Sequence, residues 1–218
     1  MAQCTPKSFD LTGKVALITG ASYGIGMAIA KAMAANGATI VFNDLKQELV
    51  DKGLAAYAEA GIKAHGYVCN VCDEDAVNAM VAKIKAEVGP VDILVNNAGI
   101  ARMIPVNNMD DALRDLHYQV NMVGTWNCVK AFLPHMIERK YGRILNMSSV
   151  TGPRVVDPGM MGYAMSKGAI SAFTKAIAMD VAKYGITSNA ILPGYFLTPM
   201  VMHSAQETDP ENPQRVLD

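Results

Sequence analysis

The stretch L-I-T-G-A-S-Y-G-I-G, from Leu17 to Gly26, decides the fold that this chain predicts. An apolar run that ends at Thr19 turns through glycines into a helical stretch. A turn without side chains can approach a pyrophosphate closely, and the N-terminus of the helix stabilises its charge. Gly20 and Gly24 are separated by three residues rather than one, so the G-x-G-x-x-G fingerprint fits only loosely. A tight turn that simply requires glycine stays open as an alternative.

Short apolar runs rich in β-branched residues alternate with helical stretches, which indicates strands buried on both faces of a parallel sheet. We expect strands at Lys14–Thr19, Ala38–Asn43, Ala64–Cys69, Asp92–Val95, Gly142–Met147 and Ile186–Leu192. We expect helices at Ile25–Asn36, Lys46–Ala60, Asp73–Val88, Asp110–Lys140 (broken once) and Gly162–Tyr184. The alternation predicts the α/β class: a single doubly wound parallel sheet of the Rossmann type, in strand order 3-2-1-4-5-6, in one domain over residues 1–218.

Asp44 stands at the end of the second expected strand, in I-V-F-N-D-L. A carboxylate at this place accepts hydrogen bonds from the ribose hydroxyls of NAD and repels the additional phosphate of NADP. Leu45 follows where an arginine would have favoured that phosphate. Asp44 therefore favours NAD over NADP, although capping of the helix Lys46–Ala60 is an alternative role for the same side chain.

The composition is that of a soluble globular protein, with 51% apolar residues, 18% charged residues and a net charge of −1. This charge gives no electrostatic reason to expect nucleic acid or an anionic membrane as a partner. The N-terminus lacks the apolar core of a signal peptide, and no run approaches the length of a membrane span. We expect a cytoplasmic protein.

Cys69 and Cys72 form a C-x-x-C pair, which raises the question of a metal or redox site. No second pair follows at zinc spacing, and neither cysteine opens a helix as a redox thiol would. We expect Cys69 to be a small buried apolar residue. His117 and His135 lie on helical tracts without matching ligands, so we expect surface or packing residues there, and no metal.

Tyr163 and Lys167 are four residues apart in G-Y-A-M-S-K, so they share one face of a helix. A free tyrosine has a pKa near ~10, and lowering it to about 7 requires roughly 4 kcal/mol. An ammonium about 5 Å away supplies roughly 3 kcal/mol at an effective dielectric near 20. The pair therefore predicts proton transfer, with a second cation completing the shift.

Five motifs in order resemble the short-chain dehydrogenase/reductase family over nearly the whole chain. They are T-G-A-S-Y-G-I-G, N-N-A-G at Asn96–Gly99, Asn121, Ser149 with Y-A-M-S-K, and P-G-Y-F-L-T-P at Pro193–Pro199. N-D-L-K-Q-E-L-V-D-K-G and S-S-V-T-G-P-R-V-V-D-P-G are similar to bacterial gluconate 5-dehydrogenases and related sugar-acid oxidoreductases. The resemblance implies an enzyme that interconverts a secondary alcohol and a ketone.

The resemblance implies a catalytic set of Asn121, Ser149, Tyr163 and Lys167. Tyr163 is the expected acid/base, Lys167 lowers its pKa, Ser149 binds the substrate oxygen, and Asn121 holds a water of a proton relay. Ser149 rather than Ser148 matches the family motif, and only one of two adjacent strand residues can face the site. A helix-capping or kinking role for Asn121 stays open.

The resemblance also implies the cofactor contacts. They are Gly20, Ser22, Tyr23, Gly24, Ile25, Gly26, Asp44, Leu45, Asn70, Val71, Asn97, Ala98, Gly99, Tyr163, Lys167, Pro193, Gly194 and Thr198. The family usually has aspartate at the position of Asn70, where an asparagine oxygen can still accept a hydrogen bond from adenine. Family members also continue further, whereas His203–Asp218 is expected to be a polar loop that enters a helix cut short, without the usual seventh strand.

The substrate is expected above the carboxyl ends of the strands. The expected lining is Ser149, Arg102, Arg154, Val155, Met160, Met161 and Tyr195. Either arginine can bind a sugar-acid carboxylate, although solvated loop arginines are an equally good interpretation. The methionines suit an apolar wall, so a steroid, acyl or other secondary alcohol is an alternative substrate. A nucleotide-sensing protein with little turnover is a second alternative, and the resemblance implies a homo-oligomer.

Overall fold

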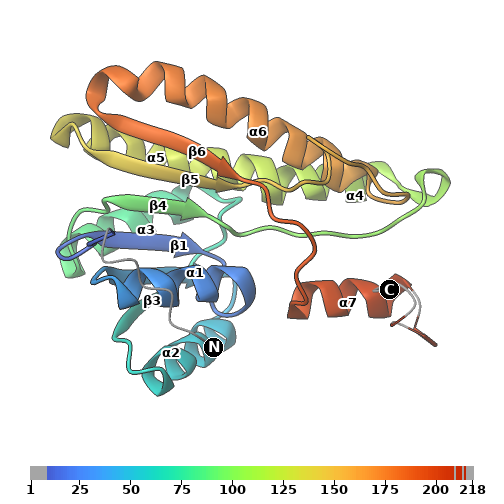
Figure 1. Cartoon of the computed structure of the whole chain (residues 1–218), viewed down its shortest axis with the longest axis horizontal. Coiled ribbons are helices and arrows are strands. Elements are labelled where there is room, and N and C mark those ends of the chain that lie inside the picture. The colour runs from blue at the N-terminus through green and yellow to red at the C-terminus, as the bar shows by residue number, and fades with distance from the viewer. Residues whose placement is uncertain (1–8, 209, 213, 215–218) are drawn as a thin grey trace.

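The computed structural model describes residues 9–208, 210–212 and 214, and shows one parallel sheet of six strands covered by helices on both faces (Figure 1). The strands are β1 (Val15–Thr19), β2 (Thr39–Asp44), β3 (Ala64–Val68), β4 (Ile93–Asn96), β5 (Gly142–Met147) and β6 (Ile186–Ile191). Their order is β3-β2-β1-β4-β5-β6, and every pairing is parallel. The predicted fold class and strand order are confirmed.

Alternation along the strands builds two cores. In β1, Val15 and Leu17 belong to one core, and Ala16 and Ile18 belong to the other. Because neighbouring residues of a strand face opposite sides of the sheet, each strand must be apolar throughout to fill both cores. This explains the continuous apolar runs in the sequence.

The helices occupy the connections that the sequence predicts. They are α1 (Gly24–Ala35), α2 (Gln47–Glu59), α3 (Glu74–Glu87), α4 (Asp111–His117), α5 (Gly124–Arg139), α6 (Met161–Val181) and α7 (Pro199–Thr208). The break expected within Asp110–Lys140 is a π-helical turn, η2 (Tyr118–Val123), which joins α4 to α5 without a loop. Among the described residues, no helix combines the length and apolar character that a membrane crossing needs.

The C-terminal segment differs from the prediction. The expected loop from His203 is incorrect up to Thr208, because helix α7 already begins at Pro199 and includes those residues. Figure 1 shows α7 at the end of a long connection from β6, beyond the carboxyl ends of the strands. Part of the predicted segment, at positions 209, 213 and 215–218, lies outside the described residues.

A buried tyrosine supports the glycine turn after β1. The hydroxyl group of Tyr57, on α2, donates to the carbonyl oxygen of Ala21 at 2.8 Å. Its ring is fully buried, and its centroid lies 5.0 Å from that of Phe42 on β2. The turn is therefore held by a hydrogen bond from α2 in an apolar environment.

Replacing Tyr57 by Phe should reduce stability without changing the fold. The Ala21 carbonyl group would lose its buried partner, which typically costs about 1–2 kcal/mol. Urea unfolding of Tyr57→Phe should show this loss, while Tyr118→Phe, at a ring that is 51% exposed, should unfold as the parent chain does. Equal stability of the two variants would contradict the role of the Tyr57 hydroxyl group.

Candidate functional site

Two loops at the carboxyl ends of the strands are joined by hydrogen bonds. The side-chain amide of Asn97 donates to the carbonyl oxygens of Thr19 and Gly20, at 2.9 and 3.0 Å. The backbone amides of Asn97 and Ala98 both donate to the hydroxyl oxygen of Thr19. A Cβ at Gly20 would lie 2.9 Å from the Cα of Ala98, so the loops meet where only glycine fits. The motifs T-G-A-S-Y-G-I-G and N-N-A-G therefore form one unit.

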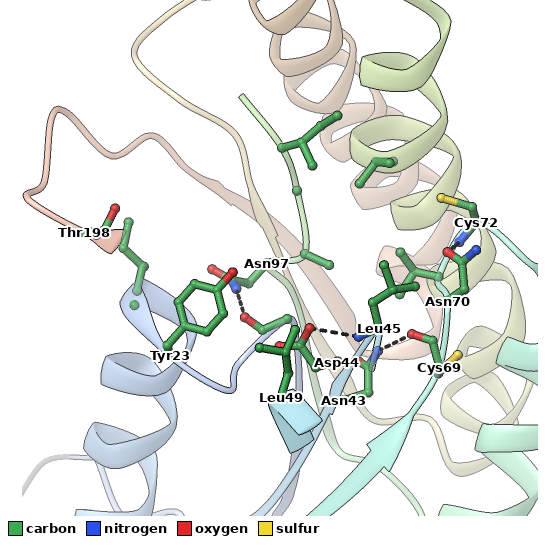
Figure 2. A pocket seen from close by; sticks show the side chains of 18 residues that line it. Tyr23, Asn43, Asp44, Leu45, Leu49, Cys69, Asn70, Cys72, Asn97 and Thr198 are labelled. Atoms are coloured by element: carbon green, nitrogen blue, oxygen red, sulfur yellow. Dashed lines mark hydrogen bonds between the residues drawn. The ribbon is translucent and has the colours of Figure 1, made fainter. Parts of the chain in front are cut away.

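This unit borders a pocket of about 300 Å³ (Figure 2). Its lining residues are Gly20, Tyr23, Gly24, Ile25, Asn43, Asp44, Leu45, Leu49, Cys69, Asn70, Val71, Cys72, Asn97, Ala98, Gly99, Ile100, Val120 and Thr198. The structure brings together most of the predicted cofactor contacts here. Six of them are not among the lining residues: Ser22, Gly26, Tyr163, Lys167, Pro193 and Gly194.

Six lining residues were missed by sequence reasoning. They are Asn43, Leu49, Cys69, Cys72, Ile100 and Val120. Asn43 and Cys69 each stand next to a predicted contact at a strand end, so the strand pattern could have found them, and Ile100 directly follows the N-N-A-G motif. Leu49 and Val120 lie on helices, where the sequence carries no signal of their direction.

Asp44 ends β2 and faces this pocket (Figure 2). One carboxylate oxygen accepts from the backbone amide of Leu45 at 2.8 Å. The N-cap residue of α2 is Lys46, without a capping side-chain bond, so the alternative that Asp44 caps this helix is wrong. Burial raises the pKa of Tyr23, and the charge of Asp44 raises it further. A phenol and a carboxylate therefore share this end of the pocket.

Asn70 lines the same end through a local turn. Its side-chain oxygen accepts from the backbone amide of Cys72 at 3.0 Å. Cys69 is buried, as predicted, and burial raises the pKa of its thiol to about 11. Burial also raises the pKa of Cys72. These shifts are opposite to the lowered pKa of a reactive thiol, so both cysteines serve as pocket wall. Cys4 lies outside the described residues.

The pocket residues fit a bound dinucleotide. Among the described residues, the side-chain oxygens of Ser22, Asn43 and Asn96 are buried without a hydrogen-bond partner. Ser22 belongs to the glycine turn and Asn43 to the pocket wall, where a polar ligand can satisfy such atoms. Gly24 has φ +64°, and a Cβ there would meet nothing within 4 Å, which leaves room beside the first turn of α1.

The two serines after β5 face different ways. The hydroxyl group of Ser148 lies 2.8 Å from the carbonyl oxygen of Lys167, on α6, and is occupied there. Ser149 is buried, accepts from the backbone amide of Thr151 at 3.1 Å, and hydrogen-bonds Tyr163. Of the two, Ser149 therefore stands beside the tyrosine.

Tyr163 and Lys167 lie on one side of α6, with the ammonium nitrogen 5.6 Å from the ring centroid. Burial nevertheless raises the pKa of Tyr163, and only the hydrogen bond from Ser149 opposes this effect. Burial also lowers the pKa of Lys167 to about 8. The expectation that lysine provides most of the tyrosine shift is therefore wrong for the protein alone, because desolvation outweighs the attraction between the two charges.

Asn121 holds the segment that follows β4. Its side-chain oxygen accepts from the backbone amide of Ile100 at 2.8 Å, and its side-chain nitrogen donates to the Ile100 carbonyl at 3.0 Å. The same nitrogen donates to the hydroxyl oxygen of Ser166 at 2.9 Å. Asn121 lies in the π-helical turn, where it links the strand end to α6.

The predicted substrate residues lie on three loops. Arg102 follows β4 and is half-buried, whereas Arg154 is exposed on the β5–α6 connection. Tyr195 is exposed on the connection to α7, and its hydroxyl group donates to a carboxylate oxygen of Asp157 at 2.5 Å. Burial and this bond raise the pKa of Tyr195 to about 12. Asp157 was not predicted.

Met160, Met161 and Val155 complete the predicted substrate lining, but they do not share one environment. Met160 is buried, while Met161 and Val155 are exposed. The structure therefore supports no single methionine wall at this place.

Comparison with known proteins identifies the family. The family described as short chain dehydrogenase matches residues 14–209. The chain belongs to this family. It is therefore an oxidoreductase of CH–OH groups with a site for NAD or NADP, as the resemblance implied.

Individual relatives agree with this assignment. Oxidoreductase UcpA of Salmonella typhimurium is 46% identical over 207 residues, 95% of this chain and 78% of that protein. A 2-dehydro-3-deoxy-D-gluconate 5-dehydrogenase of Formosa agariphila is 42% identical over 191 residues, 87% of this chain and 72% of that protein. A crystal structure of a gluconate 5-dehydrogenase from Burkholderia cenocepacia, in complex with NADP and tartrate, has a TM-score of 0.83 at 38% identity and covers 88% of this chain and 75% of that one.

The buried ammonium of this dehydrogenase should reduce its stability at neutral pH. Below pH 8 the folded chain keeps a desolvated charge at Lys167, while the unfolded chain holds it in water. Between about 8 and the ordinary value of 10.5, the folded chain loses the proton and the unfolded chain keeps it, so stability rises with pH in this window. Lys167→Met should therefore be more stable than the parent chain at pH 7, by about 1–3 kcal/mol.

Urea unfolding at pH 7 and at pH 10 measures this effect. The advantage of Lys167→Met should shrink at the higher pH, and Lys175→Met, at an exposed position of α6, should show no such advantage. A destabilised Lys167→Met protein at pH 7 would contradict the cost of the buried charge.

Proposed function

We propose that this chain catalyses the NAD-dependent interconversion of a secondary alcohol and a ketone on a sugar acid, such as gluconate and 5-ketogluconate. The observation that carries the proposal is the placement of Ser149, Tyr163 and Lys167 together, beside a pocket suited to a dinucleotide. A nicotinamide dinucleotide bound there would supply the hydride acceptor. Residues of the chain must then take up the hydroxyl proton of the alcohol.

In the oxidative direction, the phenolate oxygen of Tyr163 takes the hydroxyl proton of the alcohol. Ser149 donates a hydrogen bond to the same substrate oxygen and orients it. The Lys167 ammonium favours the phenolate by its charge, but burial alone keeps the pKa of Tyr163 high. The proposal therefore requires further positive charge near the phenol during turnover.

Loss of the phenol should abolish turnover while leaving dinucleotide binding intact. Tyr163→Phe and Ser149→Ala should each reduce kcat by about 100-fold or more, because general acid/base and oriented hydrogen-bond catalysis contribute at this scale. NADH formation with a panel of aldonates and polyols measures kcat, and calorimetry measures NAD affinity. Ser148→Ala, whose hydroxyl group faces α6, should keep most of the activity. A fully active Tyr163→Phe enzyme would exclude the proposed role.

The preference for NAD rests on Asp44. Its carboxylate lines the pocket, and the following residue is the apolar Leu45. The Burkholderia relative was crystallised with NADP, so membership of the family leaves this choice open. A carboxylate beside the ribose site disfavours the additional phosphate of NADP by charge repulsion.

Removing the Asp44 charge should change the cofactor ratio. Asp44→Ser should improve NADP affinity relative to NAD by about tenfold, the effect of one repulsive charge pair near the surface. Asp51→Asn, on the exposed side of α2, is the matched control and should leave the ratio unchanged. Fluorescence titration measures the dissociation constants of NAD and NADP. An equal ratio of these constants in the two variants would contradict the proposal.

The sugar-acid substrate is supported by the sugar-acid dehydrogenases among the relatives and by the two arginines on the site loops. One observation favours the alternative of a more apolar alcohol. A second pocket, of about 600 Å³, lies against the start of α6. Apolar side chains make most of its wall: Met103, Pro105, Val106, Val156, Pro158, Met161, Ala164 and Met165. The panel of alcohols should therefore include steroid and acyl substrates.

Two further predictions remain open. Association into a homo-oligomer stays a prediction, for which exposed Trp126 on α5 and exposed Met165 and Met179 on α6 provide candidate contact surface. Sedimentation velocity measures it. The cytoplasmic location likewise stays a prediction.

A further inference from the structure

Two side chains of one helical segment clamp the chain that leaves β4. Asn121 binds both backbone groups of Ile100, and His117, four residues earlier, binds the backbone of Arg102. The Arg102 amide donates to Nε2 of His117 at 3.1 Å. Residues four apart share a helix face, so both clamps act from the same side. They hold the two ends of the segment Ile100–Arg102.

The histidine is fully buried, and its ring has a defined tautomer. Nδ1 lies 2.9 Å from the carbonyl oxygen of Leu113, which can only accept, so Nδ1 carries the proton. Nε2 must then be the acceptor for the Arg102 amide. Neutral imidazole satisfies both partners at once, whereas imidazolium has no acceptor and would face the Arg102 N–H with another N–H.

The same two side chains also meet α6 beside the catalytic tyrosine. Asn121 donates to Ser166, and a Cβ built on Gly162 would lie 3.2 Å from Nδ1 of His117. Gly162 and Ser166 are again four residues apart and flank Tyr163 in the sequence. His117 thus packs between the segment that carries Arg102 and the first turn of α6.

We infer that His117 is a positioning residue, which holds the Arg102 segment in its working place against α6 only while its ring is neutral. The inference rests on the proposed function insofar as this segment binds the substrate. It predicts a loss of substrate binding on acidification that originates at His117 and leaves the dinucleotide pocket unchanged.

The electrostatic surroundings agree with a neutral ring. Burial lowers the pKa of His117 below its ordinary value of 6.5, the carbonyl of Leu113 opposes this, and the Arg102 charge adds to the lowering. From α6 the ring meets Gly162, which is also close to the sulfur of Met109. Folding therefore disfavours the proton. Stability weakens as the pH falls from 6.5 towards the lowered pKa of His117, and the clamp itself is lost as the pH falls through that lowered pKa.

Two substitutions separate the roles of the ring nitrogens. In His117→Gln the side chain can reach the Arg102 amide with an oxygen that accepts and does not titrate. In His117→Asn the shorter side chain can replace Nδ1 but cannot reach Arg102. At pH 8, His117→Gln should retain kcat/KM, while His117→Asn should lose about tenfold, mainly through KM for the alcohol, because a buried amide is left unpaired.

The pH profile gives the decisive comparison. The parent enzyme should lose kcat/KM as the pH falls through the lowered pKa of His117, which lies below 6.5, and His117→Gln should lack this acid limb. His135→Gln, on α5 with a partly exposed ring, is the matched control and should keep the limb. NAD affinity should be equal in all four proteins. An acid limb unchanged in His117→Gln, or parent-like kinetics of His117→Asn at pH 8, would overturn the inference.

The role of His117 can also be tested by a measurement that needs no turnover, so its result does not depend on the proposed function. Hydrogen exchange of the peptide that contains Arg102, corrected for the intrinsic pH dependence of exchange, reports the clamp directly. Protection should fall on acidification in the parent chain and in His135→Gln, but not in His117→Gln. If no alcohol is turned over, the proposed function fails and this exchange pattern still decides the role of His117; protection independent of pH in the parent chain would refute it.

Discussion

The buried ammonium of Lys167 is the constraint on which the site depends. Only 5% of this residue is exposed, and its nitrogen donates to the Met147 carbonyl at 2.7 Å. A single neutral acceptor does not replace the hydration of a charge, so burial lowers the pKa to about 8. The ammonium therefore remains mostly charged at neutral pH but close to losing its proton. The phenol of Tyr163 experiences the same dry environment, which works against its ionisation.

The surrounding elements are arranged so that the charge stays in place. Ser148 fixes the backbone of α6 at Lys167, and Gly99 leaves the space above the ammonium free. A Cβ at Gly99 would lie 2.9 Å from the Asn121 side-chain oxygen and 3.5 Å from the ammonium nitrogen. The glycine of N-N-A-G is thus required by the close approach of Asn121, while it also lines the pocket and lies beside the lysine ammonium. The pocket and the proposed acid/base pair share one wall.

Sequence periodicity predicted the sheet order, the strand positions and the shared face of Tyr163 and Lys167, because these depend on local spacing. It did not predict that Tyr163 has a raised pKa, since desolvation depends on everything packed around the phenol. The π-helical form of the expected break, and the choice of a buried rather than a surface position for His117, were not predicted for a related reason. Both depend on contacts between α4 and α6, elements about 50 residues apart in the chain. Loop residues such as Asp157 carried no pattern at all.

The placement of site residues on regular elements or on connections bears on which substrate the site can bind. The groups proposed to move the proton, Tyr163 and Lys167, lie on α6, where regular structure fixes them, and Ser149 follows the end of β5. The charged groups near them, Arg102 and Asp157, lie on connections, and Asp157 is tied to Tyr195 of a third connection. A carboxylate substrate meets attraction from one loop and repulsion from another. The Tyr195 hydroxyl group donates to Asp157 without removing its negative charge, so the side of Arg102 is the more favourable place for an acidic substrate.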